Sequence, residues 1–209
     1  MRAPKPLAIR PPKRPSARIG GRDTNLQRSE TVLVLVDFIN PMKVPGAAKL
    51  ARHAVRAAHA TARLKATMTG AGAATVYAND NYGHWRSAFD DTLAHCLELG
   101  GPPGRIADLL KPTADDVIIL KPRHSAFYGT PLDLLLAQMH TRNLVVAGLA
   151  TDICVQLTAM DASLRGYNLW VPSDCTAAES ATQARNALLY MQRVLKAHVV
   201  PFAGRRDAR

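Results

Sequence analysis

The sequence predicts an α/β domain of three layers (α/β/α), with helices on both faces of a six-stranded, mainly parallel, Rossmann-like sheet. Three observations predict it: short β-branched apolar runs, longer helical stretches between them, and alternation of the two in units of about 30 residues. Nearly uninterrupted apolar runs are typical of strands that are buried on both faces, as in a parallel sheet. Strand–helix alternation then implies right-handed crossovers and a doubly wound fold, in which functional residues lie beyond the carboxyl ends of the strands.

Each element follows from its local pattern. Strands are predicted over residues 31–36, 73–78, 116–120, 144–147, 168–171 and 199–202. Helices are predicted over residues 47–69, 104–110, 132–140, 152–165 and 178–197. Gly70 and Gly166 fit helix ends, and Pro131 fits a helix start. A chain of 209 residues suits one domain, which we place at residues 29–204, followed by a short C-terminal tail at 205–209.

The basic charge is concentrated at the N-terminus. Residues 1–28 contain eight Lys or Arg and one acid, Asp23, so they account for +7 of the net charge of +11. Five prolines and few large apolar side chains leave this segment little apolar surface to bury, and we predict a mobile tail or a strap that lies on a neighbouring surface. A basic tail can contact nucleic acid or acidic lipid. Because no aromatic residues are interleaved with the charges, a solubilising role is the favoured interpretation.

The cysteines and the apolar runs indicate the compartment. Cys96, Cys154 and Cys175 are odd in number, widely spaced and form no CxxC pair, so no disulfide framework is implied. No apolar run approaches the roughly 20 residues that span a bilayer. No apolar stretch near Met1 resembles a secretory signal. We therefore expect a cytoplasmic protein with no membrane partner and a thiol available for chemistry.

Three reactive side chains follow three predicted strands. Asp37 directly follows the first strand in VLVDFIN, Lys121 follows the third in VIILKPRHSAFYGTP, and Cys154 follows the fourth after a short turn in VVAGLATDICV. Because the carboxyl ends of parallel strands share one edge of the sheet, these side chains are expected to converge. A neighbouring cation favours a thiolate, and a neighbouring base accepts its proton. Lys121 would stabilise the thiolate and the oxyanion, and Asp37 would return the proton to the leaving group.

The turn GLATDIC adds a further feature to this pattern. A helix that begins near Thr151 or Asp152 would place Cys154 in its first turn, where free N–H groups and the helix dipole favour a thiolate. The same N–H groups can bind the oxyanion of a tetrahedral intermediate. Each residue alone has a plainer explanation: a cap for Asp37, a solvated charge for Lys121 and a small core residue for Cys154. When the three residues are considered together, a catalytic role is supported as well as these plainer explanations.

Four motifs together resemble the isochorismatase-like cysteine hydrolases: VLVLVDFIN, VIILKPRHSAFYGTPLD, LVVAGLATDICVQLTAMDASLRGY and VPSDC. The resemblance runs in order over residues 31–202, which is nearly everything but the tail. Each motif falls at the strand end where the family carries its Asp, Lys or Cys. The resemblance therefore implies that Asp37, Lys121 and Cys154 form the catalytic triad.

The resemblance also implies an oxyanion hole and a reaction class. The family has a cis peptide in its G-x-A-T-D turn; it corresponds to the Leu149–Ala150 bond and would aim the N–H of Ala150 beside that of Cys154. Family activities include deamidation of nicotinamide, hydrolysis of N-carbamoyl compounds, biuret and ureidoacrylates, and cleavage of the isochorismate vinyl ether. Members with the last activity lack the thiol. Cys154 therefore implies C–N hydrolysis of a small amide, N-carbamoyl or ureido compound through a thioester.

No metal or other cofactor is expected. The nicotinamidases of the family bind a metal through an Asp-x-His pair and a later His after the second strand. The matching stretch here is NDNYGHWRSAF, in which Asp80 matches but Tyr82 replaces the first His. Tyr is a poor ligand of divalent ions at neutral pH, which disfavours the metal site and nicotinamidase activity. His84 and His95 are the alternative ligands.

The same strand ends supply the predicted walls of the substrate pocket. The candidates are Phe38, Asn40, Asn81, Trp85, Phe127 and Tyr128. Aromatic walls with a few amides suit a small planar amide or ureido substrate. Alternatively, Trp85 and Phe127 pack against the core or against a partner subunit. Loops 77–104 and 124–131 are expected to shape the pocket; Cys96 and Cys175 are interpreted as structural, and His53, His59, His140 and His198 are given no role.

Two functions of other classes remain open. A catalytically silent member of the same fold would bind a metabolite or a protein. A nucleic-acid-binding protein would act through its basic tail, and this is the least favoured interpretation. Relatives with the resembled fold are usually homo-oligomers, which implies a homodimer or homotetramer here.

Overall fold

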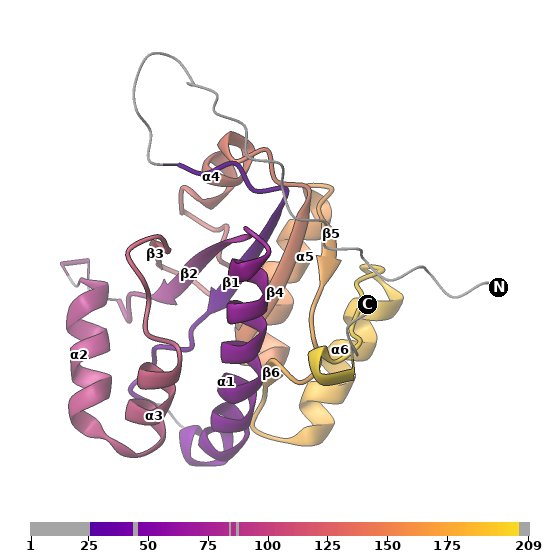
Figure 1. Ribbon diagram of the computed structural model, residues 1–209. Coiled ribbons are helices and arrows are strands. Elements are labelled where there is room, and N and C mark those ends of the chain that lie inside the picture. The colour runs from indigo at the N-terminus through magenta and orange to yellow at the C-terminus, as the bar shows by residue number, and fades with distance from the viewer. Residues whose placement is uncertain (1–25, 44–45, 84, 87, 205–209) are drawn as a thin grey trace.

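The computed structural model describes residues 26–43, 46–83, 85–86 and 88–204 (Figure 1). The predicted basic tail lies outside these ranges except for its last three residues, and so does the predicted C-terminal tail, residues 205–209. Leu26 already packs against the core, and the side chain of Gln27 donates a hydrogen bond of 3.0 Å to the carbonyl of Gly72. Among the described helices, none has the length and apolar character needed to cross a membrane.

Within the described residues, six strands form one sheet. They are β1 (Thr31–Val36), β2 (Ala74–Asp80), β3 (Val117–Lys121), β4 (Asn143–Leu149), β5 (Asn168–Trp170) and β6 (Thr176–Ala177). Their order is β3-β2-β1-β4-β5, with β6 paired to the end of β4, and every pairing is parallel. The predicted fold class is therefore confirmed.

The central strand β1 shows why the sheet is buried on both sides. Alternate side chains of a strand point to opposite faces. Leu33 and Leu35 enter one core cluster, whereas Val32, Val34 and Val36 enter the other. All five side chains are almost fully buried. The uninterrupted apolar run of the sequence thus supplies both hydrophobic cores.

Helices cover the two faces of this sheet (Figure 1). On one face lie α1 (Ala47–Gly70), α2 (Phe89–Leu99) and α3 (Gly101–Leu109), and on the other lie α4 (Leu132–Gln138), α5 (Gln156–Leu164) and α6 (Ala181–Arg193). A π-helical turn, η1 (Thr151–Val155), leads directly into α5. The helix α1 buries small alanines, among them Ala54, Ala57 and Ala58, which allows its axis to lie close to the sheet.

The predicted strand over residues 199–202 is wrong. The chain makes a single parallel bridge between His198 and Trp170, and Pro201 then lacks the N–H that a ladder would need. The carboxylate of Asp174 accepts the N–H groups of Phe202 (2.7 Å) and Ala203 (2.9 Å), and a 3₁₀ turn, η2 (Phe202–Gly204), forms instead.

The sixth strand and one helix were not predicted. The strand β6 has only two residues, too few for a recognisable pattern. The helix α2 buries Phe89, Leu93 and Cys96 at helical spacing, and α3 begins at Gly101, before its predicted start.

A glycine at the end of β4 sets how closely this strand approaches β1. Gly148 has a φ of 149°, and a Cβ atom there would lie 2.2 Å from the carbonyl oxygen of Val36. Only glycine fits this contact. It brings the residues that follow β4 next to the residues that follow β1, which is where the candidate site begins.

Candidate active site

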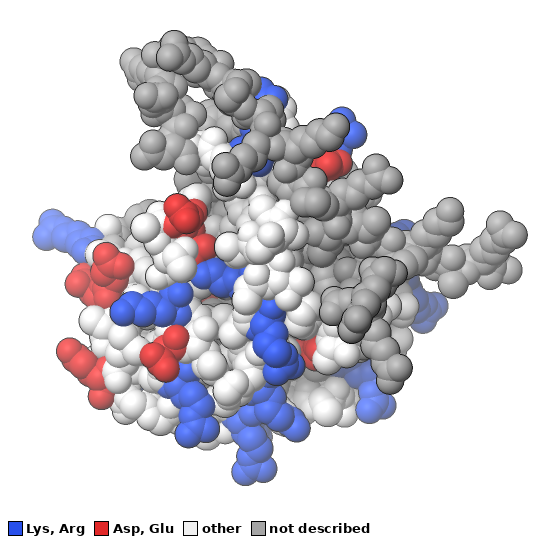
Figure 2. All heavy atoms as spheres, viewed as in Figure 1, with Lys and Arg blue, Asp and Glu red and all other residues white. Residues whose placement is uncertain are grey.

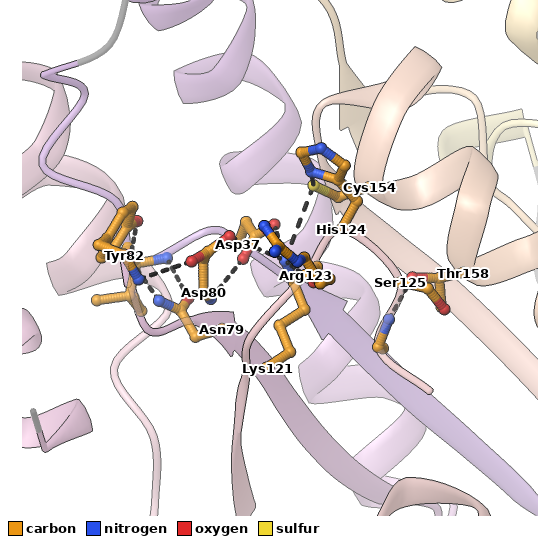
Figure 3. Close-up of polar contacts among 12 residues, drawn as sticks. Asp37, Asn79, Asp80, Tyr82, Lys121, Arg123, His124, Ser125, Cys154 and Thr158 are labelled. Atoms are coloured by element: carbon orange, nitrogen blue, oxygen red, sulfur yellow. Dashed lines mark hydrogen bonds and ion pairs between the residues drawn. The ribbon is translucent and has the colours of Figure 1, made fainter. Parts of the chain in front are cut away.

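The ends of four parallel strands meet at one edge of the sheet. Asp37 directly follows β1, Asp80 ends β2, Lys121 ends β3, and Cys154 lies in η1 just after β4. In the sheet register Asp80 pairs with Lys121, while Val36 pairs with Gly148. Figure 3 shows the side chains of these four residues gathered in one place.

Lys121 is the centre of this group. Its Nζ lies 2.8 Å from Oδ2 of Asp37, 3.5 Å from Oδ2 of Asp80 and 3.8 Å from Sγ of Cys154. It also donates to the carbonyl of Arg123 at 3.2 Å. The side chain of Lys121 is 0% exposed, so water does not screen these contacts. The structure therefore brings together the three residues that the sequence singled out as a triad.

Asp37 is held by the backbone around it. Its φ of 51° is left-handed, and its N–H donates to the carbonyl of Ala78 (3.1 Å). Oδ1 accepts the N–H of Asp80 at 2.7 Å, which leaves Oδ2 for Lys121. The side chain of Asn79 ties down the next turn, because its Oδ1 accepts the N–H of Ile39 (3.3 Å) and its Nδ2 donates to the Ile39 carbonyl (2.8 Å).

The turn that carries Cys154 is anchored at its first residue. The hydroxyl of Thr176 donates to the carbonyl of Gly148 (2.8 Å), so the hydroxyl of Thr151 must be the donor in the 2.9 Å contact between the two hydroxyls. The preceding Leu149–Ala150 peptide is cis, as the resemblance implied. Cys154 is 8% exposed and lies in the first turn of the combined helix. The oxyanion hole from the N–H groups of Ala150 and Cys154 stays a prediction.

The electrostatics favour a neutral thiol in the resting site. Burial raises the pKa of the Cys154 thiol, the negative charge of Asp37 raises it further, and the charge of Lys121 only partly opposes them. Burial also raises the pKa of the Asp37 carboxyl above its ordinary value of 3.8, although Lys121 lowers it. Burial alone would lower the pKa of Lys121, but the charges of Asp37 and Cys154 raise it on balance. A protonated thiol and an unusually basic carboxylate thus both contact one cation, the ammonium of Lys121.

The loop after Lys121 is fastened to the helix that follows Cys154. The hydroxyl of Ser125 donates a short hydrogen bond to Oδ2 of Asp161, and the N–H of Ala126 donates to Oγ1 of Thr158 at 3.0 Å. Asp161 and Thr158 both belong to α5. These bonds fix the distance between Lys121 and Cys154.

Four further residues of the site were not assigned to it from the sequence. Asp80 contacts Lys121, Asn79 holds the turn after Asp37, and the carbonyl of Arg123 accepts from Lys121. The fourth is His124, whose Nδ1 lies 3.6 Å from Sγ of Cys154 although the residue itself is exposed. Its place three residues after Lys121, at a strand end, was the available signal.

The predicted pocket residues fall into three groups. Phe38 and Phe127 are buried in the two core clusters; the Phe127 ring packs against Tyr167 and lies under the guanidinium of Arg165. Trp85 and Tyr128 are 82% and 63% exposed. The amide oxygens of Asn40 and Asn81 accept backbone N–H groups two residues ahead, at 2.7 and 2.9 Å, and so stabilise turns. For Phe127, packing in the core is the alternative that the structure supports.

The remaining metal and cysteine candidates lie apart. Nε2 of His95 is 2.9 Å from Nζ of Lys43, and His84 lies outside the described residues. In the described part of the chain no three His, Cys, Asp or Glu side chains form a group that could hold a metal ion. Cys96 and Cys175 are fully buried in the same core cluster, and within the described residues neither thiol is hydrogen-bonded to Asp37, Lys121 or Cys154.

Comparisons with known proteins agree on one family. The family model of the isochorismatase domain matches residues 31–201. The isochorismatase family protein YaaI of Bacillus subtilis is 30% identical over 174 residues, which cover 83% of this chain and 95% of that protein. The ureidoacrylate amidohydrolase RutB of Cronobacter sakazakii is 35% identical over 106 residues, but these cover only 47% of this chain and 46% of RutB.

Solved structures share the fold. N-carbamoylsarcosine amidase from Thermoplasma acidophilum superposes with a TM-score of 0.63 at 26% identity, covering 85% of this chain and 99% of that one. The nicotinamidase SaPncA from Staphylococcus aureus superposes with a TM-score of 0.65 at 22% identity, covering 83% and 99%. The second likeness, at this low identity, supports the fold alone.

Proposed function

Because this chain belongs to the isochorismatase family, whose members include amidohydrolases, we propose that it hydrolyses the C–N bond of a small amide, N-carbamoyl or ureido compound through a thioester on Cys154. The observation that carries the proposal is the meeting of three groups. The Sγ of Cys154 and Oδ2 of Asp37 both contact one buried ammonium, that of Lys121. A nucleophile, a base and a cation at one strand edge are the parts that thioester catalysis needs.

The first half-reaction follows from the protonation of these groups. As Sγ of Cys154 attacks the substrate carbonyl, its proton passes to the carboxylate of Asp37, which contacts the same Lys121 ammonium as the sulfur. Lys121 keeps its charge and stabilises the sulfur as its proton leaves. The tetrahedral intermediate then collapses, and Asp37 gives the proton to the departing nitrogen. A thioester and a free amine or ammonia result, and Asp37 is a carboxylate again.

The relatives support the substrate class, and the site supports metal-independent chemistry. RutB is named for ureidoacrylate and the Thermoplasma enzyme for N-carbamoylsarcosine; both substrates carry a carbonyl between two nitrogens. Tyr82 occupies the place of the first metal-ligating His of the nicotinamidases, and Asp80 contacts Lys121 instead. We therefore propose a ureido or N-carbamoyl compound ahead of nicotinamide.

The test is release of ammonia from a panel of small amides, N-carbamoyl amino acids and ureido compounds. Cys154→Ala is expected to lower turnover by several orders of magnitude, because it removes the nucleophile. Cys96→Ala, which alters a buried thiol outside the site, is the matched control and is expected to keep turnover. Full turnover by Cys154→Ala would refute the thioester mechanism.

A second measurement separates this proposal from a silent binding protein and needs no substrate. Iodoacetamide is expected to alkylate Cys154 before Cys96 and Cys175, because the other two thiols are 0% exposed, whereas Cys154 is 8% exposed and lies beside the ammonium of Lys121. Peptide mapping after brief treatment identifies the modified thiol. Equal or slower reaction of Cys154 would support the silent alternative.

Three further features belong to the proposal. We assign catalysis to residues 29–204 and leave the basic segment 1–28 outside it. Both basic and acidic side chains are present on the face shown in Figure 2. The nucleic-acid alternative is assigned to segment 1–28, which accounts for +7 of the net charge of +11. A homodimer or homotetramer in the cytoplasm stays a prediction; the exposed apolar residues Ile153, Leu157 and Leu164 along the outer side of η1 and α5 are consistent with a subunit contact.

A further inference from the structure

The sulfur of Cys154 has a second polar neighbour that the first half-reaction does not use. Nδ1 of His124 lies 3.6 Å from Sγ, and Figure 3 shows the imidazole on one side of the sulfur and Lys121 on the other. The two sides differ in their access to water. Lys121 is fully buried and the side chain of Asp37 is 7% exposed, whereas His124 is exposed.

The proton balance of the second half-reaction requires a group that can accept one proton and release it again. After the first half-reaction the proton of the thiol has left with the amine, so the thioester has no proton to regain from within the site. Hydrolysis needs a water molecule to lose one proton on attack and the sulfur to gain one on release. A base close to both the sulfur and the solvent can do both.

Asp37 is less accessible to solvent for this second task. Its side chain is 7% exposed, whereas His124 is exposed and its Nδ1 lies 3.6 Å from the sulfur. The ring presents Nδ1 to the sulfur.

We propose that His124 is the general base of the second half-reaction, the hydrolysis of the Cys154 thioester. Nδ1 accepts a proton from the attacking water as the water oxygen bonds to the thioester carbonyl carbon. The tetrahedral intermediate collapses, the C–S bond breaks, and the carboxylic or carbamic acid leaves. The sulfur then takes the proton back from Nδ1, which restores the thiol and the neutral imidazole. This inference rests on the proposed function.

Charged residues at the ends of β1, β2 and β3 lie near the sulfur of Cys154 and the imidazole of His124. They are Asp37 after β1, Asp80 at the end of β2, and Lys121 and Arg123 at and after the end of β3. Asp37 and Lys121 form an ion pair, in which the two charges oppose each other at the sulfur.

The experiment uses p-nitrophenyl acetate, which can acylate a reactive thiol whatever the physiological substrate is. The burst of nitrophenolate reports acylation, and the decay of the acetylated protein, followed by intact-mass spectrometry, reports deacylation. His124→Gln replaces the base with a neutral side chain of similar reach. His59→Gln makes the same change at an exposed position of α1, far from the site in the sequence, and is the matched control.

We expect His124→Gln to keep the acylation burst and to slow deacylation about 100-fold or more, the contribution of a general base. Hydroxylamine, a nucleophile that needs no base, should restore turnover of the variant. Deacylation at the wild-type rate would overturn the assignment. Acylation and deacylation falling together would also overturn it, because they would indicate that the imidazole only orients the sulfur.

Failure of the underlying function gives a different result. If Cys154 is not acetylated, or if Cys154→Ala keeps the burst, the thioester mechanism fails and the role of His124 fails with it. If Cys154 is acetylated and His124→Gln behaves like His59→Gln, the nucleophile stands and only this inference is lost.

Discussion

The ion pair between Lys121 and Asp37 is the part of the site whose removal should be most costly to stability. At 2.8 Å, and with an effective dielectric constant of about 20, two unit charges attract by about 6 kcal/mol. The cost of taking both charges out of water offsets most of this, so the intact pair contributes little net stability. Lys121→Met removes the attraction but leaves the carboxylate of Asp37 buried and unpaired. We expect it to lower the free energy of unfolding by about 3–5 kcal/mol.

The double variant Asp37→Asn with Lys121→Met tests this reasoning. It removes both charges, so its loss of stability is expected to be smaller than the sum of the two single losses by about 2 kcal/mol or more. Asparagine is chosen because it tolerates the left-handed φ of Asp37. The carboxylate of Asp80, which is 26% exposed, remains hydrated when Lys121 is absent.

Urea unfolding, followed by circular dichroism, measures these free energies. Lys65→Met is the matched control, since Lys65 pairs with Asp116 at 2.6 Å, with side chains 12% and 6% exposed. Asp116 keeps both the N–H and the hydroxyl of Thr113 as partners, so the control should lose less stability. The pair is not buried and coupled as described if the free energy of unfolding of Lys121→Met lies within about 1 kcal/mol of the wild-type value. The same conclusion follows if the stability losses of Asp37→Asn and Lys121→Met add up to the loss of the double variant.

Three further predictions follow from the same geometry. Because burial raises the pKa of Asp37 above 3.8 and the base must be ionised, kcat/KM should fall as pH drops through that raised pKa; a flat profile down to pH 4, with folding checked by circular dichroism, would contradict it. Gly148→Ala should lower the midpoint of thermal unfolding and turnover together, because its Cβ would meet the Val36 carbonyl, whereas Gly70→Ala, with open space around it, should be neutral. Thr158→Val should cost about 1–3 kcal/mol in urea unfolding by leaving the buried N–H of Ala126 without its acceptor; an unchanged midpoint would show that this bond does not hold the loop.

The sequence alone was sufficient to predict the three central residues of the site. Asp37, Lys121 and Cys154 were found because parallel strands end at one edge, and an apolar run marks where each strand ends. The strand β6 was missed because two residues are too few to show the alternation of a strand. A strand was wrongly predicted over residues 199–202, because an apolar run does not reveal that Pro201 and the carboxylate of Asp174 interrupt the pairing.

Contacts between distant segments were beyond the sequence. Nothing near Ser125 in the chain shows that its hydroxyl meets Asp161, 36 residues later. The imidazole of His124 could be noticed as a neighbour of Lys121 in sequence, but not as a neighbour of Cys154. Phe127 was predicted as a pocket wall because it lies in the loop after β3. Its ring is instead buried, because it packs against Tyr167 and the guanidinium of Arg165.

The two tryptophans of the chain lie in opposite environments, and this gives the protein two separate optical reporters. Trp170 is 1% exposed and should emit at short wavelength until the molecule unfolds, whereas Trp85, 82% exposed in the loop that follows β2, should emit as an indole in water. The spectrum of Trp85→Phe therefore follows unfolding alone. The difference between this spectrum and that of the wild type follows the loop, so ligands can be screened by fluorescence titration before any turnover is known.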